Sequence, residues 1–252
     1  NKTVKKIYAN ETFDVSSLGQ SRKRNYEVDY YAFNGEKQHV IPVSDYFKDL
    51  HNKIKTQFGD NNAIITSKTE NEDKYLIYVT SDKLVGIYYL YDYTKDSFKE
   101  LMNLMPQLAA NDMAEMRPIQ FTTRDGLNMY AYLTIPNKAS KDNKVPLIVN
   151  PHGGPYGVRD AWRFNPETQL FASRGFATIQ INYRGSGGYG KEFFLAGSKQ
   201  IGRKMLNDLE DGVAYAKSLG FIQEDKIAVY GASYGGLATL GSLVKTPDLY
   251  TC

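Results

Sequence analysis

Residues 231–235 (Gly-Ala-Ser-Tyr-Gly) match the pattern G-x-S-x-G and are the part of the sequence best suited to chemistry. They follow an apolar stretch at residues 226–230 and precede a helical pattern at residues 236–244. A serine hydroxyl is a weak nucleophile at neutral pH, so hydrolases hold it on a strained strand-to-helix turn where a base can take its proton. The pattern therefore predicts that Ser233 is a catalytic nucleophile with unusual backbone dihedral angles. The alternative is a glycine-rich loop with an incidental serine.

A second candidate is the His-Gly-Gly-Pro segment at residues 152–155, directly after an apolar stretch at residues 145–150. In α/β-hydrolases the loop at this place supplies one N–H donor to the oxyanion hole, and the residue after the nucleophile supplies the other. We therefore expect the donors to come from Tyr234 and from His152 or Gly153. Taken alone, this segment is only a tight turn, and a single histidine is more often structural than catalytic.

Residues 185–190 (Gly-Ser-Gly-Gly-Tyr-Gly) satisfy the dinucleotide-binding pattern G-x-G-x-x-G. That function also needs an acidic residue about twenty positions further on, at the end of a second strand. The acids at that distance, Asp208, Glu210 and Asp211, lie inside a helical pattern instead. The three histidines of the chain are scattered without the spacing of metal ligands. We expect no cofactor and no metal.

Composition narrows the class of protein. The chain has 252 residues, 42% apolar and 23% charged, which is enough for one large domain or two smaller ones. A net charge of +3 gives nucleic acid little to bind, and the basic cluster at residues 22–24 is typical of a solvated loop. No apolar run reaches the ~18 residues of a membrane span. We expect a soluble chain without nucleic-acid or membrane partners.

The ends of the chain leave its compartment open. The only cysteine is Cys252, so no internal disulfide can form. The first residues lack the apolar stretch of a signal peptide, but the chain begins with Asn1 rather than Met. A targeting signal can have been removed, and both a cytoplasmic and a periplasmic or secreted location stay open.

The first half of the chain has the pattern of antiparallel strands. An Asn34-Gly35 turn predicts a hairpin between residues 26–33 and 38–42. A helix is predicted at residues 45–58, with Ser44 as its N-cap. Short strands at close spacing then predict a four-stranded meander at residues 63–68, 74–81, 85–91 and 97–102.

After Pro118 strands alternate with helices, which indicates an α/β layered sheet. A hairpin is predicted around Asp125-Gly126, between residues 119–123 and 129–135. The remaining predicted strands are apolar and typical of a buried parallel sheet: residues 145–150, 176–183 and 226–230. The remaining predicted helices span residues 166–174 and 204–219 and end at glycines.

Four motifs in the same order and spacing resemble the prolyl oligopeptidase family of serine peptidases, and most closely its acylaminoacyl and dipeptidyl peptidase branch. They are residues 152–155, 182–190, 204–213 and 231–236. The resemblance implies an α/β fold, with a truncated α/β-hydrolase sheet preceded by the C-terminal part of a β-propeller. We expect the propeller blades in residues 1–116 and the N-terminal part of the hydrolase domain in residues 117–252.

The resemblance also implies a triad of serine, aspartate and histidine in that chain order. No histidine follows Ser233, and the one acid that does, Asp248, stands beside Pro247 at a helix end. We therefore expect a fragment that ends just after the nucleophile and is inactive alone. Many members of the family have tyrosine at the position of His152, so either the imidazole or the Gly153 N–H can be the donor here.

Three functions remain open. The first is a serine peptidase that hydrolyses short peptides through an acyl-enzyme on Ser233. The second is a carboxylesterase or lipase on the same fold, since both reactions share acyl-enzyme chemistry. The third is a non-catalytic fragment or interaction module. If residues 226–230 form an edge strand with Ile227 and Val229 poorly covered, the chain can also form homo-oligomers through that edge.

Overall fold

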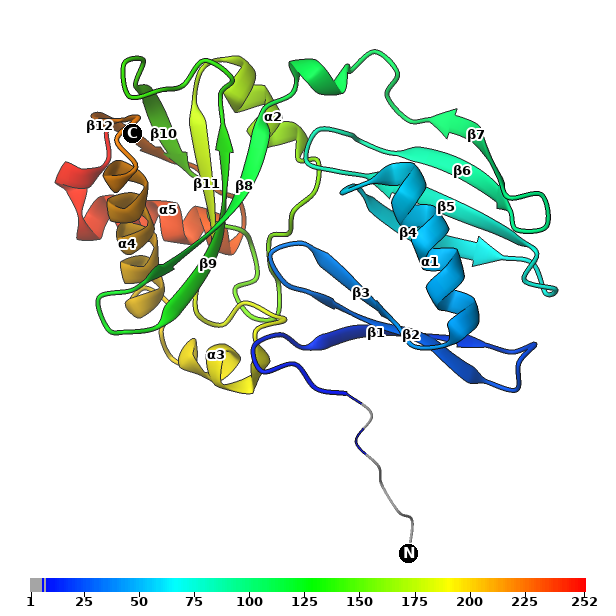
Figure 1. Cartoon of the computed structure of the whole chain (residues 1–252). Helices are drawn as coiled ribbons and strands as arrows, with labels where there is room; N and C mark the ends of the chain where they lie inside the picture. Colours follow the sequence, from blue (N-terminus) through cyan, green and yellow to red (C-terminus); the bar gives the residue numbers. More distant parts are fainter. Residues whose placement is uncertain (1–5, 7) are drawn as a thin grey trace, which may run out of the picture.

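The structure is a computed structural model that describes residue 6 and residues 8–252. Residues 15–103 form two antiparallel sheets and one helix (Figure 1). The three-stranded sheet has the order β1-β2-β3, and the four-stranded sheet has the order β4-β5-β6-β7. The elements are β1 (Val15–Ser21), β2 (Glu27–Asn34), β3 (Gln38–Pro42), α1 (Asp45–Phe58), β4 (Asn62–Lys68), β5 (Lys74–Thr80), β6 (Ile87–Asp92) and β7 (Ser97–Asn103).

Helix α1 joins the two sheets. Ser44 caps it by accepting a hydrogen bond from the Phe47 N–H, as the sequence predicts. Its apolar face is buried in one core with side chains of both sheets. The predicted hairpin and meander are confirmed to within a few residues. Strand β1 was not predicted, because its residues are mostly polar and exposed and show no apolar alternation.

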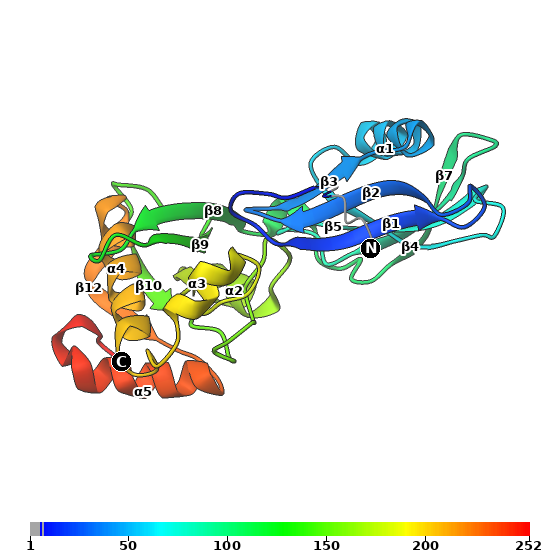
Figure 2. The ribbon, with the colours of Figure 1, turned by 90° about the horizontal axis from the view of Figure 1, so that it is seen from below.

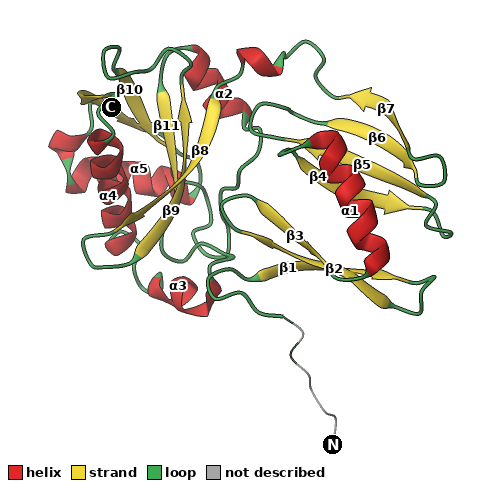
Figure 3. Cartoon of the chain, in the orientation of Figure 1, coloured by secondary structure: helices red, strands yellow, loops and turns green. Residues whose placement is uncertain are grey.

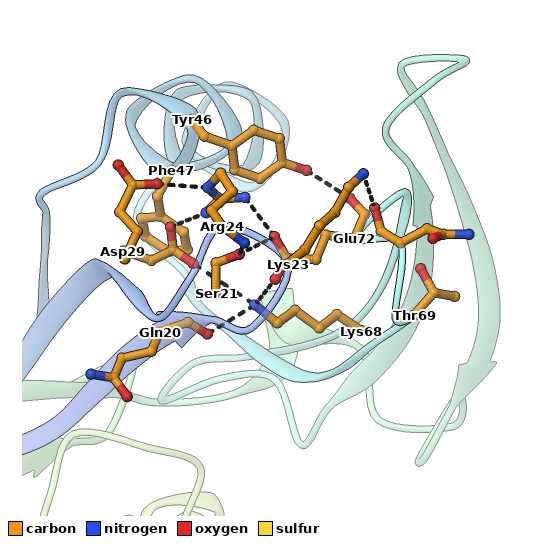
Figure 4. Close-up of polar contacts among 12 residues, drawn as sticks. Gln20, Ser21, Lys23, Arg24, Asp29, Tyr46, Phe47, Lys68, Thr69 and Glu72 are labelled. Carbon is orange, nitrogen blue, oxygen red and sulfur yellow. Dashed lines mark hydrogen bonds and ion pairs between the residues drawn. The ribbon is translucent and has the colours of Figure 1, made fainter.

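A cluster of polar side chains lies where α1 and the two sheets come together, at the turns between strands (Figure 4). Arg24, in the turn between β1 and β2, forms ion pairs with Asp29 of β2 and with Glu72 in the turn between β4 and β5. Lys68 donates to Glu72 at 2.7 Å and lies 3.8 Å from Asp29. The guanidinium of Arg24 lies over the ring of Tyr46 on α1. Arg24 and Lys68 together therefore link the two sheets and helix α1.

Residues 115–249 form the second region, a five-stranded sheet with helices (Figure 3). The strand order is β12-β10-β11-β9-β8, parallel among β12, β10 and β11 and antiparallel at β9 and β8. The elements are β8 (Glu115–Thr122), β9 (Asn128–Ile135), β10 (Val145–Val149), α2 (Pro166–Ser173), β11 (Ala177–Asn182), α3 (Gly190–Ala196), α4 (Lys204–Ser218), β12 (Ile222–Val229) and α5 (Tyr234–Lys245). Short 3₁₀ turns lie at Ala110–Asp112 and Pro247–Leu249.

The central strand β11 is buried along its whole length, as expected for a parallel strand with both faces covered. Helix α4 packs closely on one face, where a Cβ on Gly212 would lie 2.2 Å from Ile181 Cδ1. Gln180 and Asn182 alternate with Ile181 and so point to the other face. There both contact Asp160. The short helix α3 was not predicted, because it begins at Gly190, the last residue of the glycine-rich segment, where the sequence indicates a loop.

Strand β12 lies at the edge of the sheet, as predicted, but its residues are not poorly covered. Ile227 is fully buried and Val229 is 6% exposed. On the open side, Thr251 N–H donates to Ile227 O at 2.7 Å, and Val229 N–H donates to Cys252 O at 2.9 Å. The expectation of a bare apolar edge was therefore wrong, because residues 251–252 supply these backbone partners.

The two regions lie next to each other and are hydrogen-bonded across their boundary (Figure 2). Arg159 donates to the carbonyl oxygens of Asn34 and Gly35, in the turn between β2 and β3, at 2.8 and 2.9 Å. Lys37 lies over the ring of Trp162, with 3.9 Å from its Nζ to the ring centroid. A cavity of about 890 Å³ with lining residues from both regions lies at this boundary. None of the helices in the described part of the chain is long and apolar enough to cross a membrane.

Candidate active site

Ser233 lies on a sharp turn between β12 and α5, with φ 59° and ψ −125°. A positive φ is rare for a residue with a Cβ and indicates local strain at a functional turn. The predicted unusual dihedral angles of Ser233 are therefore confirmed. The turn depends on glycine at position 231, because a Cβ there would lie 2.7 Å from the carbonyl carbon of Gly235.

The turn packs against the loop that follows β10, which we call the 151–158 loop. A Cβ on Gly235 would lie 2.2 Å from Pro151 O, so only glycine allows this approach. A Cβ on Gly153 would lie 3.4 Å from Ser233 Cβ and 3.8 Å from Ser233 Oγ. The structure thus places Gly153 beside Ser233, although 80 residues separate them in sequence (233 − 153). Tyr234 is the first residue of α5, so its peptide lies at the positive end of the helix dipole.

Both ring nitrogens of His152 lie within hydrogen-bond distance of neighbouring groups. Its Nδ1 lies 2.7 Å from Gly153 O and 3.0 Å from the Tyr183 hydroxyl, and its Nε2 lies 3.0 Å from Ser186 Oγ. Burial lowers the pKa of His152 and so favours the neutral ring. Because both ring nitrogens have partners, the geometry favours the Gly153 N–H over the imidazole as the oxyanion donor.

The glycine-rich segment at residues 185–190 supports this loop. Gly157 N–H donates to Gly185 O, and Gly187 N–H donates to Val158 O, both at 3.1 Å. A Cβ on Gly187 would lie 2.5 Å from Gly157 O. These glycines are therefore explained by backbone-to-backbone packing with the 151–158 loop.

Sequence reasoning missed a buried ion-pair network beside this segment. Arg184 donates to both carboxylate oxygens of Asp208, on α4, and to both of Asp125, in the turn between β8 and β9. Arg184 and Lys204 hold the pKa of Asp125 well below its usual range. Burial raises the pKa of Asp208 to about 6, although Arg184 acts against the rise. Asp208 and Asp125 are distant in sequence from Arg184, and no local pattern marks them as its partners.

Asp160 is a second buried acid near the loop. Gln180 Nε2 donates to its Oδ1 at 2.9 Å, while Oδ2 is buried without a hydrogen-bond partner among the described residues. Burial raises the pKa of Asp160 to about 7, and the charges of Arg163 and Arg159 limit the rise.

The remaining histidines lie in the other region: His39 on β3 and His51 on α1. Within the described residues no group of three or more histidine, cysteine, aspartate or glutamate side chains is placed to hold a metal ion. What the arrangement offers is a strained serine beside a helix N-terminus and a glycine peptide. That set can place a nucleophile next to donors for a developing negative charge.

Comparison with known proteins identifies this arrangement. A model described as the prolyl oligopeptidase family matches residues 162–252, which include the turn at Ser233 and the glycine-rich segment. Residues 162–252 belong to the prolyl oligopeptidase family. The predicted resemblance to this family is thereby confirmed.

Two relatives of this chain carry the names of enzymes that act on peptides. Dipeptidyl aminopeptidase BIII of Pseudoxanthomonas mexicana is 32% identical over 200 residues, which cover 77% of this chain and 29% of that protein. The acylamino-acid-releasing enzyme of Sus scrofa is 29% identical over 127 residues, covering 50% of this chain and 17% of that protein. The chain thus spans less than a third of the length of these relatives.

Solved structures agree with this assignment at the level of the fold. The structure described as Pyrococcus horikoshii acylaminoacyl peptidase has a TM-score of 0.68 and 22% identity, covering 95% of this chain and 36% of that chain. The likeness covers the strand-rich region as well as the sheet with the serine turn. Both regions therefore occur together in a known peptidase fold.

Proposed function

We propose that the protein is a serine peptidase that forms an acyl-enzyme on Ser233, with the N–H groups of Tyr234 and Gly153 as its oxyanion hole. The observation that carries the proposal is the positive φ of Ser233 at the start of α5, beside Gly153. Membership of the prolyl oligopeptidase family supports a peptide substrate.

The chemistry follows from that geometry. Ser233 Oγ attacks the carbonyl carbon of the scissile peptide while a base removes its proton, and negative charge develops on the carbonyl oxygen. The partial positive charge at the N-terminus of α5 and the two N–H groups stabilise that charge. Departure of the amine, which takes up the proton, leaves the acyl-enzyme, and water then releases the second product.

We further propose that residues 1–116 are the C-terminal blades of a propeller-like domain and that residues 117–252 belong to an α/β-hydrolase domain. The four-stranded meander and the parallel sheet support this division. The chain spans less than a third of the length of these relatives. Among the described residues, no hydrogen bond joins His39, His51 or His152 to Ser233. The base and its orienting acid would then come from sequence outside these 252 residues, and this chain alone would be inactive.

The test uses the complete protein encoded by the source gene. Ser233→Ala should lower kcat/KM for short peptides by at least about 10⁴-fold and abolish labelling by a fluorophosphonate. Ser242→Ala is the matched control, because Ser242 is a buried serine of the same helix α5. It should leave both activity and labelling unchanged.

Two outcomes would change the conclusion. Equal peptide hydrolysis by the wild type and Ser233→Ala would refute the role of Ser233. Hydrolysis of short esters with no cleavage of any peptide would favour a carboxylesterase on the same fold instead.

A further inference from the structure

Tyr183, the residue after β11, lies between the two parts of the site. It is fully buried. Its ring stacks on the His152 ring with 4.3 Å between centroids, and it lies 5.4 Å from the Tyr234 ring. One aromatic side chain therefore contacts both residues that flank Ser233 in space, one in the 151–158 loop and one in α5.

The hydroxyl of Tyr183 acts on the Gly153 peptide directly. It donates a hydrogen bond to His152 O at 2.7 Å. That carbonyl and the Gly153 N–H belong to the same peptide unit, which is planar and normally trans. Fixing the direction of the C=O therefore fixes the N–H, which points the opposite way, away from Tyr183. A hydrogen bond to the carbonyl also polarises the peptide and makes its N–H a stronger donor.

Neighbouring contacts hold Tyr183 itself in place. The next residue, Arg184, is anchored through its backbone N–H and its guanidinium to Asp208, which is fully buried. Ser186 is three residues after Tyr183. Its Oγ lies 3.0 Å from His152 Nε2, on the other side of the imidazole. The tyrosine, its supporting turn and the histidine thus form one rigid unit behind the Gly153 peptide.

We propose that Tyr183 is a positioning residue that sets the direction of the Gly153 N–H and its separation from the Tyr234 N–H. The proposal rests on the function proposed for Ser233. Tyr183 does not touch substrate in this role. It acts through the His152–Gly153 peptide and through the ring of Tyr234.

Tyr183→Phe in the complete protein tests this, because it keeps the ring contacts and removes only the hydroxyl. We expect kcat for a short peptide to fall about tenfold or more with KM within twofold, since the N–H matters most in the transition state. A peptide aldehyde, whose hemiacetal oxygen occupies the oxyanion hole, should lose affinity by a similar factor. A substrate-like peptide amide that cannot be cleaved should bind as before. Tyr215→Phe is the matched control and should change none of these values, because Tyr215 packs on Phe121, away from the loop.

Each outcome decides between roles. Unchanged kcat and aldehyde affinity in Tyr183→Phe would overturn the proposal. Equal weakening of the aldehyde and the amide would show a merely structural residue and would also overturn it. If Tyr183→Phe does not fold, Ser186→Ala takes its place with the same readouts, because it releases the other side of His152. Ser233→Ala runs in parallel, so activity that does not depend on Ser233 would refute the proposed function rather than this inference.

Discussion

Arg24 in the strand-rich region and Arg184 in the second region each form a cluster with the acids that they pair with. The two clusters differ in whether a second cation also pairs with the most buried acids. In the strand-rich region, Arg24 pairs with Asp29 and Glu72, and Lys68 is a second cation for both acids. In the second region, Arg184 is the only cation paired with Asp208 among the described residues. The side chain of Arg24 is 24% exposed and that of Arg184 only 4%. The cluster in which a fully buried acid, Asp208, has a single cation is the one that supports the candidate active site.

The largest effect is expected for Arg184→Met. It leaves the carboxylate of Asp208 fully buried without a cation, which typically costs about 3–5 kcal/mol of unfolding free energy. Peptidase activity should be lost as well, because Arg184 anchors the turn that carries Tyr183. Urea unfolding and peptide hydrolysis measure both. The double variant Arg184→Met/Asp208→Leu should recover part of the stability, and no recovery would contradict the assignment of the loss to an unpaired charge.

A smaller effect is expected for Arg24→Met. Lys68 still pairs with Glu72 at 2.7 Å and lies 3.8 Å from Asp29, so neither buried acid is left without a cation. The unfolding free energy should therefore fall by only about 1–2 kcal/mol. The value of kcat/KM at a temperature well below unfolding should not change. Urea unfolding and steady-state kinetics check the two parts. A loss as large as that of Arg184→Met would show that the second cation has no energetic effect.

The smallest effect concerns Asp160, a buried acid whose hydrogen bonds leave one oxygen without a partner. Its folded pKa of about 7 lies above its unfolded value, so the folded protein binds an extra proton between roughly pH 4 and 7. This contribution to stability is present below pH 4 and is lost as the pH rises through 7. From pH 5 to pH 8 the wild type loses this contribution and Asp160→Asn does not. The unfolding free energy of the variant minus that of the wild type should therefore rise by roughly 1–2 kcal/mol over this range.

Thermal and urea unfolding at the two pH values measure the gain. Asp142→Asn is the matched control, because Asp142 is exposed, and its difference from the wild type should not depend on pH. A pH-independent difference for Asp160→Asn would show that this carboxyl does not change its protonation state between pH 5 and pH 8, and would contradict the prediction.

Local signals explain what could be predicted from sequence. The cap at Ser44 and the apolar spacing on α1 are contained within fifteen residues, so that helix was predicted with its correct limits. The turn at Ser233 is likewise marked by its own glycines. Strand β1 lacks an apolar pattern, and its pairing with β2 supplies the order that its side chains do not.

The support of the candidate site could not be predicted, because it depends on pairs far apart in the chain. Arg184 donates hydrogen bonds to Asp125, which is 59 residues away in the sequence, and to Asp208, which is 24 residues away. Tyr183 meets His152 across 31 residues. Hydrophobic periodicity carries no information about such polar pairs, and only the sheet order brings them together. The sequence marks His152 as a candidate donor, but it does not show that both of its ring nitrogens lie within hydrogen-bond distance of other groups.

The close approach of two glycine-rich backbones bears on protein engineering. Gly187 touches the backbone of Gly157, and a Cβ on Gly197 would lie 2.6 Å from the Cα of Gly185. Replacement of Gly187 would bring a Cβ to within 2.5 Å of Gly157 O, so a segment without this glycine cannot pack on the 151–158 loop in the same way. Transfer of the 151–158 loop to another scaffold would therefore have to include residues 184–197 as a single module. A library that randomises only one of the two loops would consist mostly of misfolded variants.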